Sequence, residues 1–256
     1  MITARALGYR HAPASPWLFA HLSFSLAPGQ TLVMLGRNGA GKTTLLKCLA
    51  GLLAPSQGEI DCAGVIGYVP QHFAPIFSYS VFDIVMMGRA RHVGLFSSPG
   101  ARDRACAEEA LDRLGLTALA RRSVTSLSGG ERQLVLIARA LASEADILLL
   151  DEPASALDFH NQAAVLATLR RLAAERGLTV VMTTHEPTHA LEIADRAILL
   201  HGAGVAEEGA VTDMCTETKL TELYGIPMKR LDYPVGAGQA SHIVASYASI
   251  IRPERI

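Results

Sequence analysis

Residues 31–47 read TLVMLGRNGAGKTTLLK, and they give the strongest indication of the fold class. An apolar run typical of a buried strand comes first, and the pattern of a helix follows it. Between them the sequence matches the spacing G-x-x-x-x-G-K-[ST]. Small residues let backbone N–H groups close around phosphate oxygens, and the start of a helix adds its positive end. The stretch therefore predicts a phosphate-binding loop made by Gly36, Arg37, Asn38, Gly39, Ala40, Gly41, Lys42, Thr43 and Thr44.

Two side chains of this loop carry its chemistry. Lys42 is placed to reach the β- and γ-phosphates of a nucleoside triphosphate, and the Thr43 hydroxyl is placed to ligate Mg²⁺. A glycine-rich turn with a chance lysine is the alternative. The order of strand, loop and helix argues against that alternative, so we expect a nucleotide site.

A second apolar run, Ile147–Leu150, ends in the acid pair Asp151 and Glu152. Ligands in parallel sheets sit at the carboxyl ends of the strands, where this pair is expected. Asp151 is predicted to hold Mg²⁺, and Glu152 to polarise an attacking water as general base. The alternative is that the two acids are solvated at a turn before Pro153. The presence of the phosphate-binding loop argues against that alternative.

Strand and helix patterns alternate along the chain, and one helical block interrupts them. This arrangement predicts an α/β core with an inserted helical subdomain. The predicted elements are short strands in 1–35, a helix from Lys42 to Leu53, strands in 58–70, helices in 71–144 with a loop at 97–100 and an amphipathic helix over 102–114, a strand over 146–151, a helix over 159–175 and a strand over 179–184. Beyond residue 205 we expect a turn at Pro234–Gly238 and a final helix or strand at Ser241–Ile251.

Composition excludes several classes of protein. The chain has 256 residues, half of them hydrophobic, which allows a sizeable core and excludes wholesale disorder. A net charge of −1 argues against a nucleic-acid binder held by phosphate contacts. No apolar run reaches the roughly 18 residues of a membrane span. The four cysteines lack a C-x-x-C spacing, so a zinc ribbon or a disulfide framework is not expected, and we identify no signal peptide.

Residues 126–133 read SLSGGERQ, and this run indicates a protein family. Ser128 and Glu131 form a capping box before an apolar helix. Helix initiation alone does not explain Gly129 and Gly130, which weaken a first turn unless a ligand approaches the backbone closely. Here the chain resembles the ATP-binding cassette family, over roughly residues 1–205.

The resemblance implies an α/β fold of the P-loop NTPase (RecA-like) type with an N-terminal antiparallel β subdomain and an inserted α-helical subdomain. It implies one ATPase domain over 1–256. In that domain, 1–75 and 145–205 form the nucleotide-binding core with the β subdomain, 76–144 form the helical subdomain, and 206–256 form a short C-terminal extension.

The resemblance also implies roles for individual residues. Two cassettes pack head to tail, so that Ser128, Gly129, Gly130 and Glu131 of one subunit cap the γ-phosphate held by the other. Gln71 matches a glutamine that senses Mg²⁺, and Asp158 matches a residue that contacts the partner subunit. His185 matches the histidine that contacts the γ-phosphate. Tyr9 is predicted to stack on adenine, with Trp17 and Phe19 as rivals, and the alternative is that Tyr9 belongs to the core.

The run His185-Glu186-Pro187-Thr188-His189 also spells H-E-x-x-H, the pattern of zinc proteases. That pattern needs both histidines on one helix face. Because Pro187 stands between them and His185 ends a strand, we do not expect a zinc site, and we expect His189 on a helix surface.

Residues 78–89 resemble cassettes of bacterial importers for ferric siderophores, haem and cobalamin. The resemblance is strongest to the molybdate and tungstate importer ATPases around 66–96 and 123–152. It implies a homodimer on the cytoplasmic face of the inner membrane, beneath a permease dimer that an extracytoplasmic solute-binding protein serves. Residues 81–88 also fit plain helix core. A soluble cassette ATPase of DNA repair or translation is the alternative, and a nucleotide kinase leaves SLSGGERQ unexplained.

Overall fold

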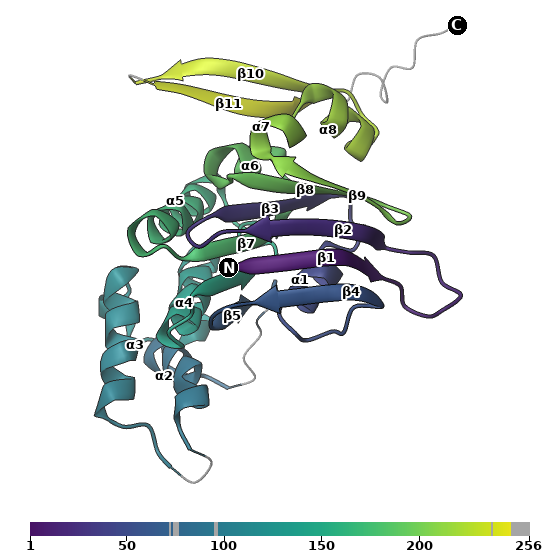
Figure 1. Ribbon diagram of the computed structural model, residues 1–256. Coiled ribbons are helices and arrows are strands. Elements are labelled where there is room, and N and C mark those ends of the chain that lie inside the picture. The colour runs from purple at the N-terminus through teal and green to yellow at the C-terminus, as the bar shows by residue number, and fades with distance from the viewer. Residues whose placement is uncertain (72, 74–76, 95–96, 237, 247–256) are drawn as a thin grey trace, which may run out of the picture.

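The computed structural model describes residues 1–71, 73, 77–94, 97–236 and 238–246. A six-stranded sheet lies at its centre, and two further layers cover the two faces of that sheet (Figure 1). The first five strands run parallel, and the last is antiparallel to its neighbour. In spatial order they are β5 (Ile66–Val69), β6 (Ile147–Leu150), β7 (Thr179–Thr184), β3 (Thr31–Gly36), β8 (Arg196–Gly202) and β9 (Val205–Ala210).

Alternate side chains of the central strands belong to two separate cores. In β3, Leu32 and Met34 pack into one core, whereas Val33 and Leu35 pack into the other. Because both faces are covered, every residue of β3, β6 and β7 is buried. This explains why these strands read as unbroken apolar runs rather than as alternating ones.

A three-stranded antiparallel sheet, in the order β2-β1-β4, packs on one of these cores with helix α1. Its strands are β1 (Ile2–Tyr9), β2 (Phe19–Leu26) and β4 (Gln57–Cys62). Helix α1 runs over Lys42–Leu49, which is shorter than the predicted Lys42–Leu53. The prediction was wrong at this end because Gly51 takes a left-handed φ of 69°, and the chain turns there rather than at Pro55.

The helical insertion lies at one end of the sheet (Figure 1). It contains α2 (Val81–Met86), η1 (Met87–His92), α3 (Ala101–Arg113), η2 (Thr117–Leu119), η3 (Val124–Ser126) and α4 (Gly129–Ala142). Arg89 is buried at its centre, and its guanidinium bonds Asp103 at 3.0 Å, Glu144 at 2.9 Å and the carbonyl of Ala142 at 2.7 Å. These bonds connect η1 to α3 and to the end of α4.

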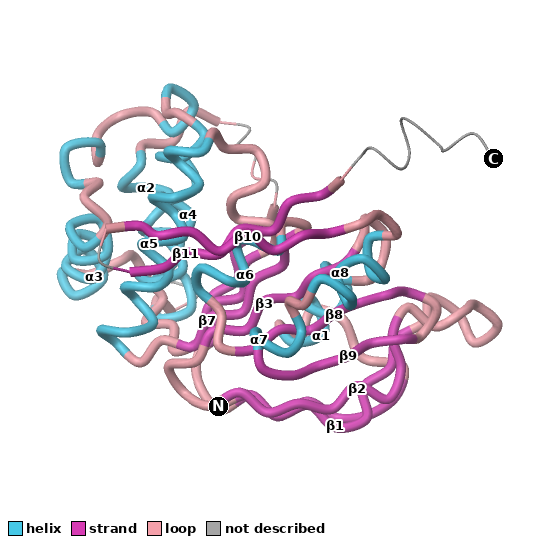
Figure 2. The backbone as a smooth tube through the Cα atoms, turned by 90° about the horizontal axis from the view of Figure 1, so that it is seen from above, coloured by secondary structure: helices cyan, strands magenta, loops and turns pink. Residues whose placement is uncertain are grey.

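The remaining helices and a hairpin complete the molecule. They are α5 (Phe159–Arg176), α6 (Pro187–Ile193), α7 (Val211–Met214), α8 (Glu217–Tyr224) and the antiparallel pair β10 (Met228–Val235) and β11 (Gly238–Ala245). Figure 2 shows the hairpin lying across α6. Residues 238–245 of the final element are thus strand, and positions 247–251 of the predicted Ser241–Ile251 segment lie outside the described residues. β9 extends the central sheet, so the C-terminal extension described here begins after Ala210.

Among the residues that the structure describes, no helix combines the length and the apolar character needed to cross a membrane.

Candidate functional site

Four predicted functional segments meet at one edge of the central sheet. The strands β5, β6, β7 and β3 are consecutive neighbours and run in the same direction. Their carboxyl ends lead to Gln71, to Asp151 and Glu152, to His185, and to the loop before Lys42. Segments that are far apart in sequence are therefore brought together by strand order alone.

A cavity of about 460 Å³ lies at this edge. The phosphate-binding loop forms one wall, and Gln71, Glu152 and His185 form another. Glycine is required at two positions of the loop. A Cβ on Gly36 would lie 2.6 Å from the carbonyl oxygen of Leu200, and Gly41 has a φ of 100°, which side chains rarely adopt. The loop residues that line the cavity are Asn38, Gly39, Gly41, Lys42, Thr43 and Thr44.

The Lys42 ammonium is buried at the mouth of the loop. Its Nζ donates to the carbonyl of Gly36 at 2.8 Å and to that of Arg37 at 3.2 Å, and it lies 3.8 Å from Glu152 Oε1. Burial lowers the pKa of Lys42, while the carboxylates of Glu152 and Asp151 act in the opposite direction. Those two acids stabilise the protonated form of Lys42 in a poorly solvated place, where its positive charge can bind a phosphate.

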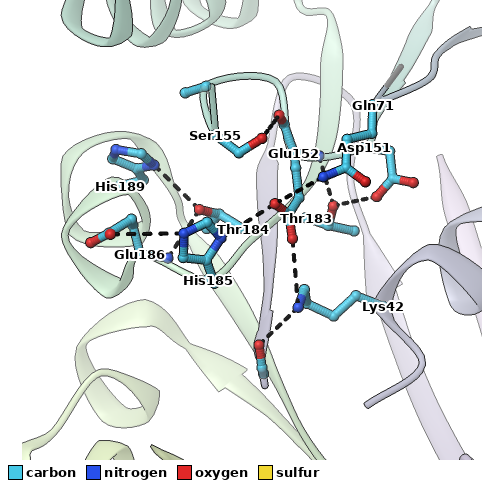
Figure 3. A network of polar contacts seen from close by, with 12 residues as sticks. Lys42, Gln71, Asp151, Glu152, Ser155, Thr183, Thr184, His185, Glu186 and His189 are labelled. Carbon is cyan, nitrogen blue, oxygen red and sulfur yellow. Dashed lines mark hydrogen bonds and ion pairs between the residues drawn. The ribbon is translucent and has the colours of Figure 1, made fainter. Parts of the chain in front are cut away.

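Asp151 connects the loop to the neighbouring strand. Its Oδ1 accepts from Thr43 Oγ1 at 3.0 Å. The same oxygen accepts from Thr183 Oγ1 at 2.7 Å (Figure 3). The hydroxyl of Thr183, in β7, also accepts from the Glu152 N–H at 2.9 Å. Thr183 thus orients both acids, and our sequence analysis missed it. Its only signal was a threonine at a core-facing position in an apolar run.

Glu152 is the hub of the site (Figure 3). Its Oε2 accepts from Gln71 Nε2 at 3.3 Å and lies 3.3 Å from His185 Nδ1. Only 12% of the side chain is exposed. Its backbone has a φ of 45°, a strained conformation for a residue other than glycine, and strain of this kind is often found at functional positions.

The segment Ser128–Glu131 lies elsewhere in the same chain, at the start of α4. Ser128 caps the helix, since its N–H donates to Glu131 Oε2 at 2.8 Å and its Oγ accepts from the Glu131 N–H at 3.3 Å. The Ser128 N–H, followed by its hydroxyl, lowers the pKa of Glu131. None of these four residues is among the described residues that line the 460 Å³ cavity.

Asp158 caps helix α5 and holds a neighbouring amide. Its carboxylate accepts from the Asn161 N–H and from Asn161 Nδ2, each at 2.9 Å. The Asn161 N–H is the main cause of the lowered pKa of Asp158. The side chain of Asp158 is exposed to solvent.

The three aromatic residues considered for adenine stacking lie in different surroundings. The Tyr9 ring stacks on Phe19 with centroids 6.4 Å apart and meets the His11 ring edge-on at 5.5 Å. His11 and Leu18 line the cavity, whereas Tyr9 is not among its lining residues. Phe19 is fully buried, and Trp17 lies beneath the Arg10 guanidinium at 4.5 Å. Sequence reasoning passed over His11 because a lone histidine in a loop carries no pattern.

His189 is buried, so its predicted place on a helix surface was wrong. Its Nδ1 lies 3.3 Å from Thr184 Oγ1, and the hairpin covers this side of α6. His185 precedes the helix that contains His189, and Pro187 is the first residue of that helix. Among the described residues no three histidine, cysteine or acidic side chains gather as a metal site.

The residues present fit a nucleotide with Mg²⁺. Magnesium prefers oxygen ligands and keeps several waters, and the Thr43 hydroxyl, the Asp151 carboxylate and the Gln71 amide offer oxygen donors around the loop. The cradle of small residues leaves room, since a Cβ on Gly39 would meet no atom within 4 Å. The fold and this site together define an ATPase with a phosphate-binding loop and an inserted helical subdomain.

Comparison with known proteins places the chain more narrowly. The family model for ABC transporters matches residues 19–155. The chain is 43% identical to the molybdate import ATP-binding protein MolC of Haemophilus influenzae, over 98% of each chain. The chain therefore belongs to the ABC transporter family and is an ATPase of that family, as predicted.

Two solved structures are similar to most of the chain. One is an inward-facing metal-chelate type ABC transporter, with a TM-score of 0.92 and 43% identity over 97% of this chain and 98% of that one. The other is a dimeric ATP-binding cassette with bound ADP and phosphate, with a TM-score of 0.69 and 27% identity over 82% of this chain and 99% of that one. The predicted fold class is confirmed.

Proposed function

We propose that this chain is the ATP-hydrolysing subunit of a bacterial importer for a metal oxyanion or a metal chelate, with molybdate and tungstate as the first solutes to test. The observation that carries the proposal is the likeness to the molybdate ATPase over 98% of both chains. The fold-level likeness to a metal-chelate type transporter supports it, since it too covers nearly the whole of both chains. Ferric siderophores, haem and cobalamin are the other members of the proposed solute class.

The proposed mechanism is in-line attack of water on the γ-phosphate. Lys42 and the loop N–H groups hold phosphate charge, while Thr43, Asp151 and Gln71 position Mg²⁺, which neutralises phosphate charge when bound. Glu152 orients the water and accepts its proton as the bond to the γ-phosphorus forms and the bond to the β-phosphate oxygen breaks. His185, beside Glu152, contacts the γ-phosphate.

The proposed working unit is a homodimer. Ser128 and Gly129 of the same chain do not line the cavity that the phosphate-binding loop lines. Both residues match the segment that caps the γ-phosphate in the family. A partner arranged head to tail supplies them, with Asp158 at the contact. An ABC cassette of similar fold is dimeric with ADP and phosphate, which supports this arrangement.

We further propose that the dimer docks a permease on the cytoplasmic face of the inner membrane, served by an extracytoplasmic solute-binding protein. The start of the helical insertion offers a contact surface, because the exposed fractions of Phe77, Tyr79 and Met87 are 65%, 36% and 43%. Val81, Ile84 and Val85 between them are fully buried, so this part of the stretch is helix core.

The test is reconstitution of the chain with its permease and binding protein in liposomes. ATP hydrolysis and uptake of labelled solute are measured with molybdate, tungstate, a ferric siderophore, haem and cobalamin, and sulfate is the control for a generic tetrahedral dianion. Glu152→Gln is the matched control for ATP-driven uptake. Stimulation by a single metal-containing solute supports the proposal. Stimulation by DNA or ribosomes, with no response to any of the solutes, would place the chain in the alternative class of soluble cassette ATPases.

A further inference from the structure

Helix α8, in the C-terminal extension, is firmly attached to the body of the protein. Leu220 is fully buried and Leu223 nearly so. Lys219 pairs with Glu207 of β9, and the Thr221 hydroxyl accepts from the N–H of Met228 at 3.0 Å. A helix anchored at its side and at its end can present its last residue in a fixed position.

That last residue is Tyr224, and it reaches the functional site. Its hydroxyl donates to the main-chain carbonyl of His185 at 3.0 Å. Tyr224 also lines a cavity of about 670 Å³ together with Arg37 and Asn38 of the phosphate-binding loop. Burial raises the pKa of Tyr224, so the phenol keeps its proton and continues to donate.

His185 is thereby held at two points. Its imidazole lies 3.3 Å from Glu152 Oε2, while its carbonyl is bonded by Tyr224. The following turn is also fixed, because the Glu186 N–H donates to Thr184 Oγ1 at 3.1 Å. A second contact from the extension reaches the same region, since the Ile243 N–H of β11 donates to Thr188 Oγ1 at 3.2 Å.

A hydrogen bond to the carbonyl of His185 fixes the plane of the peptide that follows this residue. It therefore limits changes in the direction of the Cα–Cβ bond that carries the imidazole. The ring of Tyr224 packs against the larger core, which is a separate task from that of its hydroxyl. We propose that the Tyr224 hydroxyl is a positioning group that aims His185 at the γ-phosphate and at Glu152. This inference rests on the proposed role of His185.

Tyr224→Phe tests the inference, since it removes the hydroxyl and keeps the packed ring. One hydrogen bond of this kind corresponds to about a three- to tenfold change in a rate or an equilibrium. We expect kcat for ATP to fall by about that factor while KM stays within about twofold. The melting temperature should match that of Tyr233→Phe, the control, because Tyr233 is exposed on the hairpin of the same extension. Wild-type kcat in Tyr224→Phe would overturn the proposal, and so would a loss of melting temperature that accounts for the loss of rate.

A double-mutant cycle separates positioning from a general structural effect. His185→Ala and Tyr224→Phe are combined, and hydrolysis is measured in single turnover with enzyme in excess. If Tyr224 acts through His185, the second substitution costs nothing in the His185→Ala background. Additive losses would refute the inference. These assays measure basal ATP hydrolysis, whereas the test of the proposed function measures stimulation by a solute. A failure of one proposal can therefore be distinguished from a failure of the other.

Discussion

Gly130→Ala should damage the contact between α4 and α5. Gly130 is buried in the first turn of α4. A Cβ at this position would lie 2.5 Å from Asn161 Cγ and 2.8 Å from Asn161 Cβ. Asn161 has little freedom to retreat, because two bonds of 2.9 Å tie it to Asp158. The Cβ of Asn161 moves only with the backbone of α5, so the clash must shift a helix.

The magnitude follows from two opposing effects. Overpacking of this kind costs about 1–3 kcal/mol. Alanine is a better helix former than glycine, which returns up to about 1 kcal/mol. With the midpoint of about 2 kcal/mol for overpacking, the net loss is about 1–2 kcal/mol. For a chain of this size each kcal/mol lowers the melting temperature by about 2–4 °C.

The matched control is Gly129→Ala, one residue earlier in the same helix turn. Its Cβ would meet only Leu157 Cδ2 at 3.1 Å, the end of a flexible side chain. We expect its melting temperature to stay within about 2 °C of the wild type. Calorimetric unfolding of both variants is the assay. Equal melting temperatures for Gly129→Ala and Gly130→Ala would show that a side chain at 130 does not strain the contact with Asn161.

A second-site change locates the clash. Asn161→Gly removes the Cβ and the amide that Gly130→Ala would meet. In that background, adding Gly130→Ala should lower the melting temperature no further, since the space is free. If the loss persists unchanged in the double variant, then the contact with Asn161 is not its cause.

Three further outcomes are expected. Glu152→Gln should bind ATP, accumulate as a closed dimer in gel filtration and hydrolyse ATP about 10²–10⁴-fold more slowly, and wild-type turnover would contradict its role as base. Lys42→Ala should weaken ATP binding by about tenfold or more in calorimetry, because a buried cation facing the phosphates is lost, and unchanged affinity would argue against the loop assignment. Burial is the main cause of the lowered pKa of His189, with His185 and His242 acting in the same direction and Glu186 opposing them. The unfolded chain therefore binds more protons below about pH 6.5, and the free energy of unfolding falls as pH drops through that value. In urea unfolding at several pH values, His189→Gln should lose this part of the slope, and a slope equal to that of the wild type would show that His189 titrates alike in both states.

The sequence was sufficient to predict which residues gather at this edge of the sheet when a local pattern marks each of them as standing at the end of a strand. Gly36 to Thr43, the acid pair at Asp151 and the histidine at 185 each follow an apolar run, and strand ends of a parallel sheet meet at one edge. The order of the strands in the sheet was therefore not needed to predict a common site. The expectation that these strands run parallel was enough.

The residues that were missed depend on contacts between distant segments. Thr183 looks like any threonine in a strand until its hydroxyl is seen between Asp151 and the Glu152 N–H. His189 is buried because a hairpin much later in the chain crosses α6, where the N–H of Ile243 donates to Thr188, 55 residues earlier. Neither contact leaves a periodic trace in the sequence, so neither can be inferred from local pattern.

The geometry around Glu152 shows why such distant contacts matter to chemistry. Its carboxylate receives Gln71 from the end of β5 and faces His185 from the end of β7, while its N–H is held by Thr183. A general base must stay within hydrogen-bond reach of the water it activates, and a misplacement of about 1 Å costs on the order of 10²-fold in rate. With Glu152 as the proposed base, we therefore expect a relative shift of two strand ends to change activity without altering any group that touches the nucleotide. The Tyr224 hydroxyl bonds the His185 carbonyl, so we expect a movement of α8 to reach Glu152, the proposed base, through His185.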